Sequence, residues 1–226
     1  MSKKISIAID GPAGAGKSTI ARRLAQELGY HYVDTGAIYR TVAYFFDLWG
    51  VAPKDLDGIT RYIDELNVAI EYDDEGVQHM FMNGMDVTGD IRTQEIGQKA
   101  SLVAAHAIVR EAMLDMQRDV AKNYNVIMDG RDIGTVVLPK ATVKIFMTAA
   151  PEVRARRRTD ELIAKGQKAD YNKVLKEIQQ RDYQDTHREV APLKMSRDSI
   201  KLDTSELDID GVVAAMKDII TKKVAL

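Results

Sequence analysis

The sequence predicts an α/β fold built on a parallel sheet. Short apolar runs, among them 5–9 and 143–147, lack the alternation of a half-exposed strand and are too short for helices. Longer stretches with helical spacing of apolar residues separate these runs. A glycine-rich phosphate-binding loop follows the first run directly, as it does between strand and helix in α/β proteins. The 226 residues suffice for one α/β domain with an insertion, or for two small domains.

The phosphate-binding loop is Gly-Pro-Ala-Gly-Ala-Gly-Lys-Ser at 11–18, which fits the P-loop pattern G-x-x-x-x-G-K-[ST]. Its glycines let the backbone approach an anion, and the helix-prone stretch that follows adds unpaired N–H groups and a positive dipole end. Lys17 supplies a charge for the β- and γ-phosphates, and the Ser18 hydroxyl can ligate Mg²⁺. We expect a nucleoside triphosphate on Gly11, Pro12, Ala13, Gly14, Ala15, Gly16, Lys17, Ser18 and Thr19.

Residues 30–33 predict a second short strand, followed by Asp-Thr-Gly-Ala-Ile-Tyr-Arg at 34–40. A polar turn that closes a strand and opens a helix belongs at the carboxyl edge of a sheet, where open α/β folds bind ligands. Asp34 or Thr35 can equally be a plain helix cap. Arg40 lies one turn into the predicted helix and beside the same edge, which makes it a candidate for anion binding.

The pattern changes over residues 51–92. A charged helical stretch at 56–66 precedes three short strand-like segments, and Asn83-Gly84 between two of them is a strong hairpin signal. We therefore predict an antiparallel insertion within the parallel frame. It is either a mobile substrate-binding lobe, since long insertions often carry function, or a subdomain without a role in binding. The strand-like segments are 68–72, 77–82 and 86–88.

One long helix is predicted at 93–124, because the stretch is helix-prone and contains no proline. Ser101 and Arg110 are nine positions apart, which places them on broadly opposite sides of a straight helix. Periodicity therefore gives no reason to join them in one site, and a bend or an enclosing lobe would be required. The expected buried face comprises Ile96, Ala100, Val103, Ala104, Ala107 and Val109.

Residues 125–128 predict a core strand that ends in Asp-Gly-Arg-Asp at 129–132. A carboxylate directly after an apolar strand, alongside a P-loop, is placed to organise Mg²⁺ through bound water, so Asp129 is a candidate. Arg131 suits bidentate phosphate binding. The alternative is an Asp–Arg turn on the surface with no ligand.

Two later helices carry arginines. The first opens with Pro151 and places Arg154, Arg157 and Arg158 at spacings that share a face. A solvated basic face is the ordinary explanation, but an enzyme that transfers a phosphoryl group needs cations over the migrating charge. The second helix, from 172, carries a further set of charged residues on one face. These residues either form structural ion pairs or bind a ligand. That set is Arg181, Asp185 and Arg188. A last strand is predicted at 199–203 and a closing helix at 209–224.

Composition excludes several functions. The 32 basic and 34 acidic residues give no global field for a polyanion, so no nucleic-acid polymer is expected as a partner. The absence of cysteine excludes disulfides, thiolate catalysis and cysteine zinc sites. We expect no membrane partner and a cytoplasmic location, because no signal peptide or membrane-spanning run is present. No two histidines have the sequence spacing that is typical of a pair of metal ligands. The histidines are His31, His79, His106 and His187.

Together these motifs resemble the bacterial cytidylate kinase family over essentially the whole chain. The P-loop is shared by many nucleotide-binding enzymes, whereas the blocks at 34–40 and at 129–137, Asp-Gly-Arg-Asp-Ile-Gly-Thr-Val-Val, are much narrower. Their order along the chain is that of the family. The other matching blocks are Ile-Arg-Thr-Gln-Glu at 91–95, Arg-Asp-Tyr-Gln-Asp at 181–185 and Val-Ala-Pro-Leu at 190–193.

The resemblance implies a P-loop NTPase-type three-layer sandwich with a five-stranded parallel sheet. Its antiparallel monophosphate-binding insertion would span about 51–92 and its short helical lid about 151–170 of a single unit, 1–226. The implied reaction moves the γ-phosphoryl group of ATP to CMP or dCMP, giving ADP and CDP or dCDP, with Mg²⁺ as cofactor. A monomer is expected. The core would comprise about 1–50, 93–150 and 190–226.

Residue roles also follow from the resemblance. Arg40 and Arg131 would hold the acceptor phosphate. A carboxylate at Asp132 suits cytosine, whose exocyclic amine is a donor where uracil offers an acceptor. The remaining acceptor-side residues would be Ser101 and Arg110 at the base, and Arg181, Asp185, Arg188 and Thr35 at the ribose. The transition state would be stabilised by Lys17, Arg131, Arg154, Arg157, Arg158 and a Mg²⁺ ion held by Ser18 and, through water, Asp129.

Two rival functions are open at this point. One is another small-molecule P-loop kinase, for adenylate, thymidylate or shikimate. The other is a nucleotide-binding switch without transfer activity. Against the switch, the chain lacks the Asn-Lys-x-Asp guanine motif, since Asn-Lys-Val-Leu at 172–175 does not fit, and the second arginine set would have no anion to bind.

Overall fold

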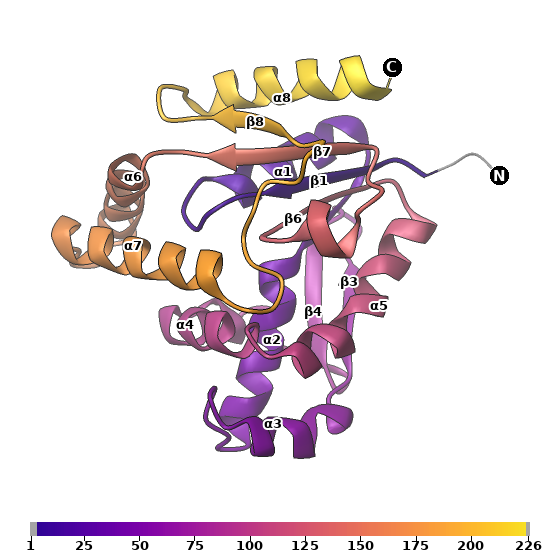
Figure 1. Ribbon diagram of the computed structural model, residues 1–226, viewed down its shortest axis with the longest axis vertical. Coiled ribbons are helices and arrows are strands. Elements are labelled where there is room, and N and C mark those ends of the chain that lie inside the picture. Colours follow the sequence, from indigo (N-terminus) through magenta and orange to yellow (C-terminus); the bar gives the residue numbers. More distant parts are fainter. Residues whose placement is uncertain (1–3, 225–226) are drawn as a thin grey trace.

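The computed structural model describes residues 4–224 of the chain (Figure 1). A parallel sheet forms its centre, with the strands in the order β2-β6-β1-β7-β8. All five strands predicted for it are present, so the predicted α/β fold with a five-stranded parallel sheet is confirmed. The strands are β1 Ser6–Asp10, β2 His31–Asp34, β6 Val126–Gly130, β7 Val143–Thr148 and β8 Ile200–Asp203.

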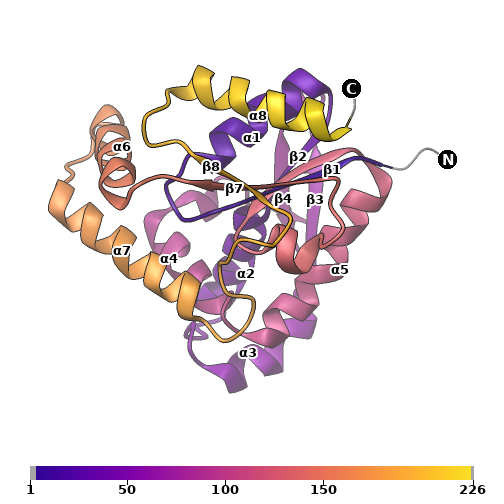
Figure 2. The same cartoon turned by 45° about the horizontal axis from the view of Figure 1, so that its top comes forward.

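Helices cover both faces of the sheet, which explains why its strands are continuously apolar (Figures 1 and 2). Ile7 and Ile9 of β1 pack into one core, and Ala8 between them packs into the other, because successive side chains of a strand point to opposite faces. The first core includes α1 Lys17–Leu28 and α8 Ile209–Val224, and the second includes α2 Thr35–Leu48 and α5 Ala107–Asn123.

The insertion is antiparallel, as predicted. Asn83 and Gly84 both have positive φ, 50° and 82°, which is the backbone that a tight hairpin turn requires and that Asn-Gly adopts readily. Met80 and Met82 of the second strand pack into the same core as α2. The elements are α3 Leu56–Tyr62, a 3₁₀ turn Ile63–Glu65, β3 Val68–Tyr72, β4 Gln78–Met82, β5 Met85–Asp86 and a 3₁₀ turn Asp90–Arg92.

The single helix predicted at 93–124 is wrong. The chain forms α4 Gln94–Val103 and α5 Ala107–Asn123, with a break at 104–106. The carbonyl of Ala104, which a continuous helix would pair four residues further on, instead accepts from Arg110 Nη1 at 3.1 Å. A ring nitrogen of His106 lies 2.8 Å from the Pro53 carbonyl oxygen. Tertiary contacts therefore stabilise the break, since these three positions contain neither glycine nor proline.

Two further helices, α6 Pro151–Ala164 and α7 Tyr171–His187, lie beyond the carboxyl ends of β7 and β8 (Figure 2). They pack on each other through a small apolar cluster of their own, which contains Ala155, Val174 and Ile178. Within residues 4–224, no helix has the length and apolar character needed to cross a membrane.

Candidate active site

The P-loop leaves β1 through backbone that only glycine accommodates. Gly11 has φ +153°, and a Cβ there would lie 1.9 Å from the Met147 carbonyl oxygen. Gly16, at the N-terminus of α1, has φ +86° in the left-handed region. These two glycines let the loop turn from the strand into α1, so that the amide groups at the start of the helix face the carboxyl edge of the sheet.

Lys17 is buried inside this loop, where its Nζ donates to the Pro12 carbonyl at 2.7 Å. Burial, and next the nearby Arg131 guanidinium, lower the pKa of Lys17 to about 7, while the carboxylates of Asp129, Asp185 and Asp10 act in the opposite direction. An anion bound next to this amine would stabilise its charged form and so raise its pKa.

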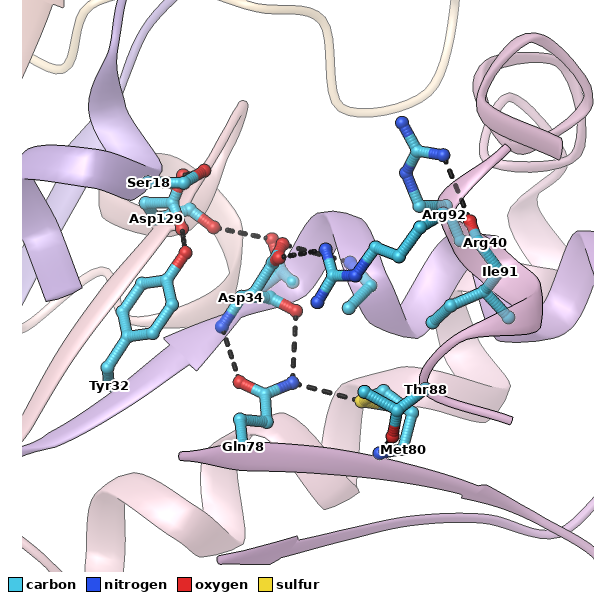
Figure 3. A network of polar contacts seen from close by, with 12 residues as sticks. Ser18, Tyr32, Asp34, Arg40, Gln78, Met80, Thr88, Ile91, Arg92 and Asp129 are labelled. Atoms are coloured by element: carbon cyan, nitrogen blue, oxygen red, sulfur yellow. Dashed lines mark hydrogen bonds and ion pairs between the residues drawn. The ribbon is translucent and has the colours of Figure 1, made fainter. Parts of the chain in front are cut away.

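Asp129 lies beside the loop, at the end of β6, with a hydroxyl group on each carboxylate oxygen (Figure 3). Tyr32 donates to Oδ1 at 2.8 Å and Ser18 donates to Oδ2 at 3.0 Å. Burial raises the pKa of Asp129 to about 6, and the two hydroxyls act to lower it. A carboxylate and a hydroxyl so close together are hard oxygen donors, which fit Mg²⁺ in the company of phosphate oxygens.

One cavity of about 340 Å³ joins the P-loop to the other polar residues of the sheet edge. Its lining includes P-loop residues, Asp129 and all nine residues expected on the acceptor side. Seven cationic side chains line it against four carboxylates, an excess that suits anionic ligands. The acceptor-side residues are Thr35, Arg40, Ser101, Arg110, Arg131, Asp132, Arg181, Asp185 and Arg188.

The helix break brings Ser101 and Arg110 into this cavity together. Arg110 forms an ion pair with Asp132 and lies over the Tyr39 ring, with 5.1 Å between the guanidinium carbon and the ring centre. Asp132 is also 3.7 Å from Arg188 Nη2. The spacing argument against joining Ser101 and Arg110 assumed a straight helix, which the structure does not contain.

Arg131 and Asp185 form a second ion pair in the cavity, with 2.7 Å between Nε and Oδ2. Burial acts to raise the pKa of Asp185, but Arg131 and the neighbouring arginines lower it overall. Among residues 4–224, Arg181 Nε and Arg188 Nη2 are buried donors without a hydrogen-bond partner. Because an unpaired buried donor is costly, these two atoms are suited to a polar ligand.

Two residues of the insertion, Gln78 and Arg92, contact Asp34 at the edge of the site (Figure 3). Asp34 caps α2 through the Ala37 N–H, as one prediction had it, and also pairs with Arg92 at 3.0 Å. The Gln78 side chain accepts from the Asp34 N–H at 2.7 Å. Arg40 Nη1 donates to the carbonyls of Ile91 and Thr93, each at 3.0 Å.

Two residues of the cavity lining, Arg92 and Tyr39, were missed by the sequence reasoning. Both belong to blocks that carry the resemblance, at 91–95 and 34–40, so the blocks themselves were the available signal. Gln78 was also missed. It lies in an ordinary strand pattern, and no sequence signal points to its contact with Asp34.

The three arginines of α6 lie at the predicted spacing on one α-helix, but each has different partners. Arg154 is buried and donates to the carbonyl of Ala13 and to Asp182. Arg157 donates to the carbonyls of Thr204 and Leu207. Arg158 forms an exposed pair with Glu161. The described residues that line the cavity exclude all three, and also Gly11, Pro12 and Ala15.

No group of three or more His, Cys, Asp or Glu side chains in residues 4–224 is arranged to hold a metal ion. A ring nitrogen of His79 lies 3.3 Å from Asp73 and the other lies 3.1 Å from Asp86, while His106 contacts the Pro53 carbonyl. No histidine of residues 4–224 lines the cavity, and the donor set of Ser18 and Asp129 would need ligands from a bound nucleotide or from water.

The comparisons with known proteins point to one family. A family model described as Cytidylate kinase matches residues 7–222. A cytidylate kinase from Exiguobacterium sp. is 49% identical over 220 residues, which cover 97% of this chain and 98% of that relative. One from Geobacillus sp. is 46% identical over 224 residues, 99% of this chain and 100% of the relative.

A solved structure with a similar fold is less alike in sequence. A shikimate kinase from Bacteroides thetaiotaomicron aligns with a TM-score of 0.49 at 16% identity, covering 96% of this chain and 98% of its own. A likeness at this level does not bear on substrate or mechanism.

Proposed function

The chain belongs to the cytidylate kinase family, and from this premise we propose how its own residues perform the reaction. It is an ATP-dependent kinase that transfers the γ-phosphoryl group of ATP to CMP or dCMP and releases ADP and CDP or dCDP. One observation carries the residue roles below: the P-loop and the arginine–carboxylate residues line the same cavity. Transfer between two nucleotides needs two adjacent anion sites.

The donor site is the P-loop, 11–19. Its amide groups and Lys17 bind the triphosphate, and Lys17 stabilises charge that develops on the transferring group. Mg²⁺ would neutralise phosphate charge when bound with ATP. Ser18 would hold it directly and Asp129 through water, a role that the contact between the two side chains supports.

The acceptor phosphate is assigned to Arg40 and Arg131, the two arginines closest in sequence to the strand ends that flank the cavity. Guanidinium groups bind phosphate bidentately and orient it for in-line attack. No general base is needed, because the attacking oxygen already belongs to an anion. These residues therefore act by alignment and charge neutralisation.

The nucleoside of the acceptor is assigned to the remaining polar residues of the cavity. Asp132 accepts a hydrogen bond from the cytosine amine, with Ser101 and Arg110 beside it. The ribose end is assigned to Thr35, Arg181, Asp185 and Arg188. The buried donor atoms of Arg181 and Arg188 that lack a hydrogen bond, Nε and Nη2, support a polar ligand there.

Closure of the site is assigned to the insertion, about 51–92, and to the arginine-bearing segment at about 151–170. Within that segment, Arg158 is the strongest candidate for contact with the transferring group. Its pair with Glu161 is exposed, and it lies near enough to Arg40 to lower the pKa of that residue, after burial and Arg92. Arg154 and Arg157 would act on the position of the segment. Closure would exclude water and limit hydrolysis of ATP.

The test is an acceptor panel with ATP and Mg²⁺, in which ADP release is measured for CMP, dCMP, UMP, AMP, dTMP and shikimate. We expect CMP or dCMP to give the highest kcat/KM, at least tenfold above the other acceptors, from roughly 1.4 kcal/mol of discrimination. A preference for AMP, dTMP or shikimate would assign the chain to another acceptor. ATP binding without acceptor-dependent turnover would instead indicate a nucleotide switch.

Location and assembly are part of the proposal. We assign the protein to the cytoplasm and expect a monomer, whose mass in solution, 25.2 kDa for one chain, can be measured by light scattering.

A further inference from the structure

The segment that follows Asp132 is a short helical turn, Ile133–Val137, whose first N–H groups are bound by a residue far away in the sequence. Asp10, the last residue of β1, accepts from the Ile133 N–H at 2.6 Å through Oδ1 and from the Gly134 N–H at 2.7 Å through Oδ2. Asp10 is 2% exposed. Both oxygens of a buried carboxylate are thus used to cap this turn.

Capping of this kind is normally done by the residue that directly precedes a helical turn, and aspartate is among the residues preferred there. Asp132 is that residue. Within the described chain, however, its side chain caps no N–H group of the turn. Its carboxylate instead pairs with Arg110 and faces Arg188 in the cavity.

We propose that Asp10 is a positioning residue for acceptor recognition: it binds the Gly134 N–H, which a capping Asp132 side chain could otherwise bind, together with the neighbouring Ile133 N–H, and so keeps the Asp132 carboxylate in the cavity. The inference rests on the proposed role of Asp132 in reading the cytosine amine. It adds a role for a residue that lies outside the cavity lining and precedes the first glycine of the P-loop.

The turn fits closely around this contact. A Cβ at Gly134 would lie 3.1 Å from Asp10 Oδ2 and 3.1 Å from Lys144 Cδ, so a side chain there would push on the carboxylate. At the other end of the turn, Arg118 of α5 donates to the carbonyls of Val136 and Val137, each at 3.1 Å. An anion at the N-terminal end and a cation at the C-terminal end both complement the dipole of the turn.

Asp10→Asn keeps the shape of the side chain but replaces one acceptor with an NH₂ group. One of the two N–H groups then loses its partner, and where this is the Gly134 N–H, the Asp132 side chain can cap it. Arg118→Gln is the matched control, because it loosens the same turn at the end remote from Asp132.

The experiment measures kcat and KM for CMP and UMP in the wild type, Asp10→Asn, Asp132→Asn, the double variant and Arg118→Gln. We expect Asp132→Asn to lower the CMP:UMP ratio of kcat/KM about tenfold or more. Asp10→Asn should lower it by a similar factor, mainly through KM for CMP, with KM for ATP within threefold of the wild type. The double variant should match Asp132→Asn alone within twofold, and Arg118→Gln should leave the ratio within twofold while lowering Tm.

Three results would overturn the inference: an unchanged ratio in Asp10→Asn, effects that multiply in the double variant, or an equal change in Arg118→Gln. If Asp132→Asn itself leaves the ratio unchanged, the proposed role of Asp132 fails instead. Should Asp10→Asn not fold, Gly134→Ala takes its place. Its methyl group presses on Asp10 Oδ2, so the ratio should fall severalfold, and an unchanged ratio in this variant counts against the inference.

Discussion

Lys17 lies in an environment that shifts its pKa into the physiological range, and in the proposed function it binds the triphosphate. Burial and Arg131 lower its pKa to about 7 in the unliganded protein. At pH 8 most molecules therefore carry a neutral amine in the loop. A bound triphosphate favours the charged amine, so binding should be coupled to uptake of a proton.

This coupling can be measured by calorimetric titration of ATP at pH 8 in buffers of different ionisation enthalpy. We expect the wild type to take up roughly one proton per ATP, and its affinity to fall about tenfold per pH unit above 7. Lys17→Met should remove this uptake, weaken ATP binding and abolish most turnover. Equal proton uptake by the two proteins would show that another group titrates, and near-normal kcat would contradict the proposed role of Lys17.

Single residues differ in how far the sequence reveals them. Six of the nine acceptor-side residues lie in blocks whose order identifies the family, while Ser101, Arg110 and Arg188 lie outside them, and all nine line one cavity. The contacts of Asp10 and Gln78 could not be predicted in this way. Their partners lie 124 and 44 positions away along the chain, and the contact depends on how the strands are arranged in space.

At the scale of elements, α6 and α7 are tied to the P-loop by Arg154. Its guanidinium bridges the Ala13 carbonyl and Asp182, at 2.9 Å and 2.6 Å. The pair of helices has only a small apolar cluster, and this partly buried ion pair adds a second connection between them. Movement of α6 would be transmitted to the loop that holds ATP.

Arg154→Ala should lower the free energy of unfolding by about 3 kcal/mol, because it leaves the Asp182 charge without its partner. KM for ATP should rise with it. Arg158→Ala is the control on the same helix. Its exposed pair contributes less than about 1 kcal/mol, so stability should hardly change, while kcat falls if Arg158 contacts the transferring group. Urea unfolding and steady-state kinetics measure both, and equal loss of stability in the two variants would contradict this division.

The boundaries of helices and turns could be predicted from the sequence where the residues at the boundary itself determine them. The turn at Asn83-Gly84 and the proline start of α6 are set by the residues themselves. The break between α4 and α5 is not, because Arg110 and His106 produce it through contacts with Ala104 and Pro53. No spacing rule reports such contacts, and the prediction of one helix failed for that reason.

For the whole molecule, two buried carboxyl groups make the free energy of unfolding depend on pH. Burial raises the pKa of Asp10 to about 6, with Asp132 adding to the shift and the two N–H groups and Lys17 opposing it. Burial also raises the pKa of Asp129 to about 6. A raised pKa means that the folded state binds a proton more tightly than the unfolded state. These groups therefore favour folding below about pH 4, and this contribution is lost as pH rises through 6.

The prediction is tested with Asp10→Asn, which cannot titrate. Between pH 7 and pH 4 the wild type should gain up to about 3 kcal/mol in the free energy of unfolding relative to this variant, from a shift of roughly two pH units. Urea unfolding of both unliganded proteins at the two pH values gives the difference. A difference that stays constant, or that grows in the other direction, would show that Asp10 is not protonated in this range.

The overall architecture was predictable because its determinants repeat along the chain. Five apolar runs, the P-loop after the first and an Asn-Gly turn inside the insertion specify the sheet, its edge and the antiparallel lobe. Strand order was not predictable from these runs, since neighbours in the sheet are distant in sequence.

That strand order also has a practical consequence for protein design. Asp10 and Gly130 are paired neighbours on β1 and β6, so the segments that begin at Gly11 and Arg131 start one inter-strand step apart, about 4.8 Å. In the proposed function, the separation between the donor and acceptor sites is therefore set by the hydrogen-bonded pairing of β1 with β6. Engineers who wish to change the accepted base can exchange side chains on α4, α5 and the turn after Asp132, and leave the paired strands β1 and β6 unchanged.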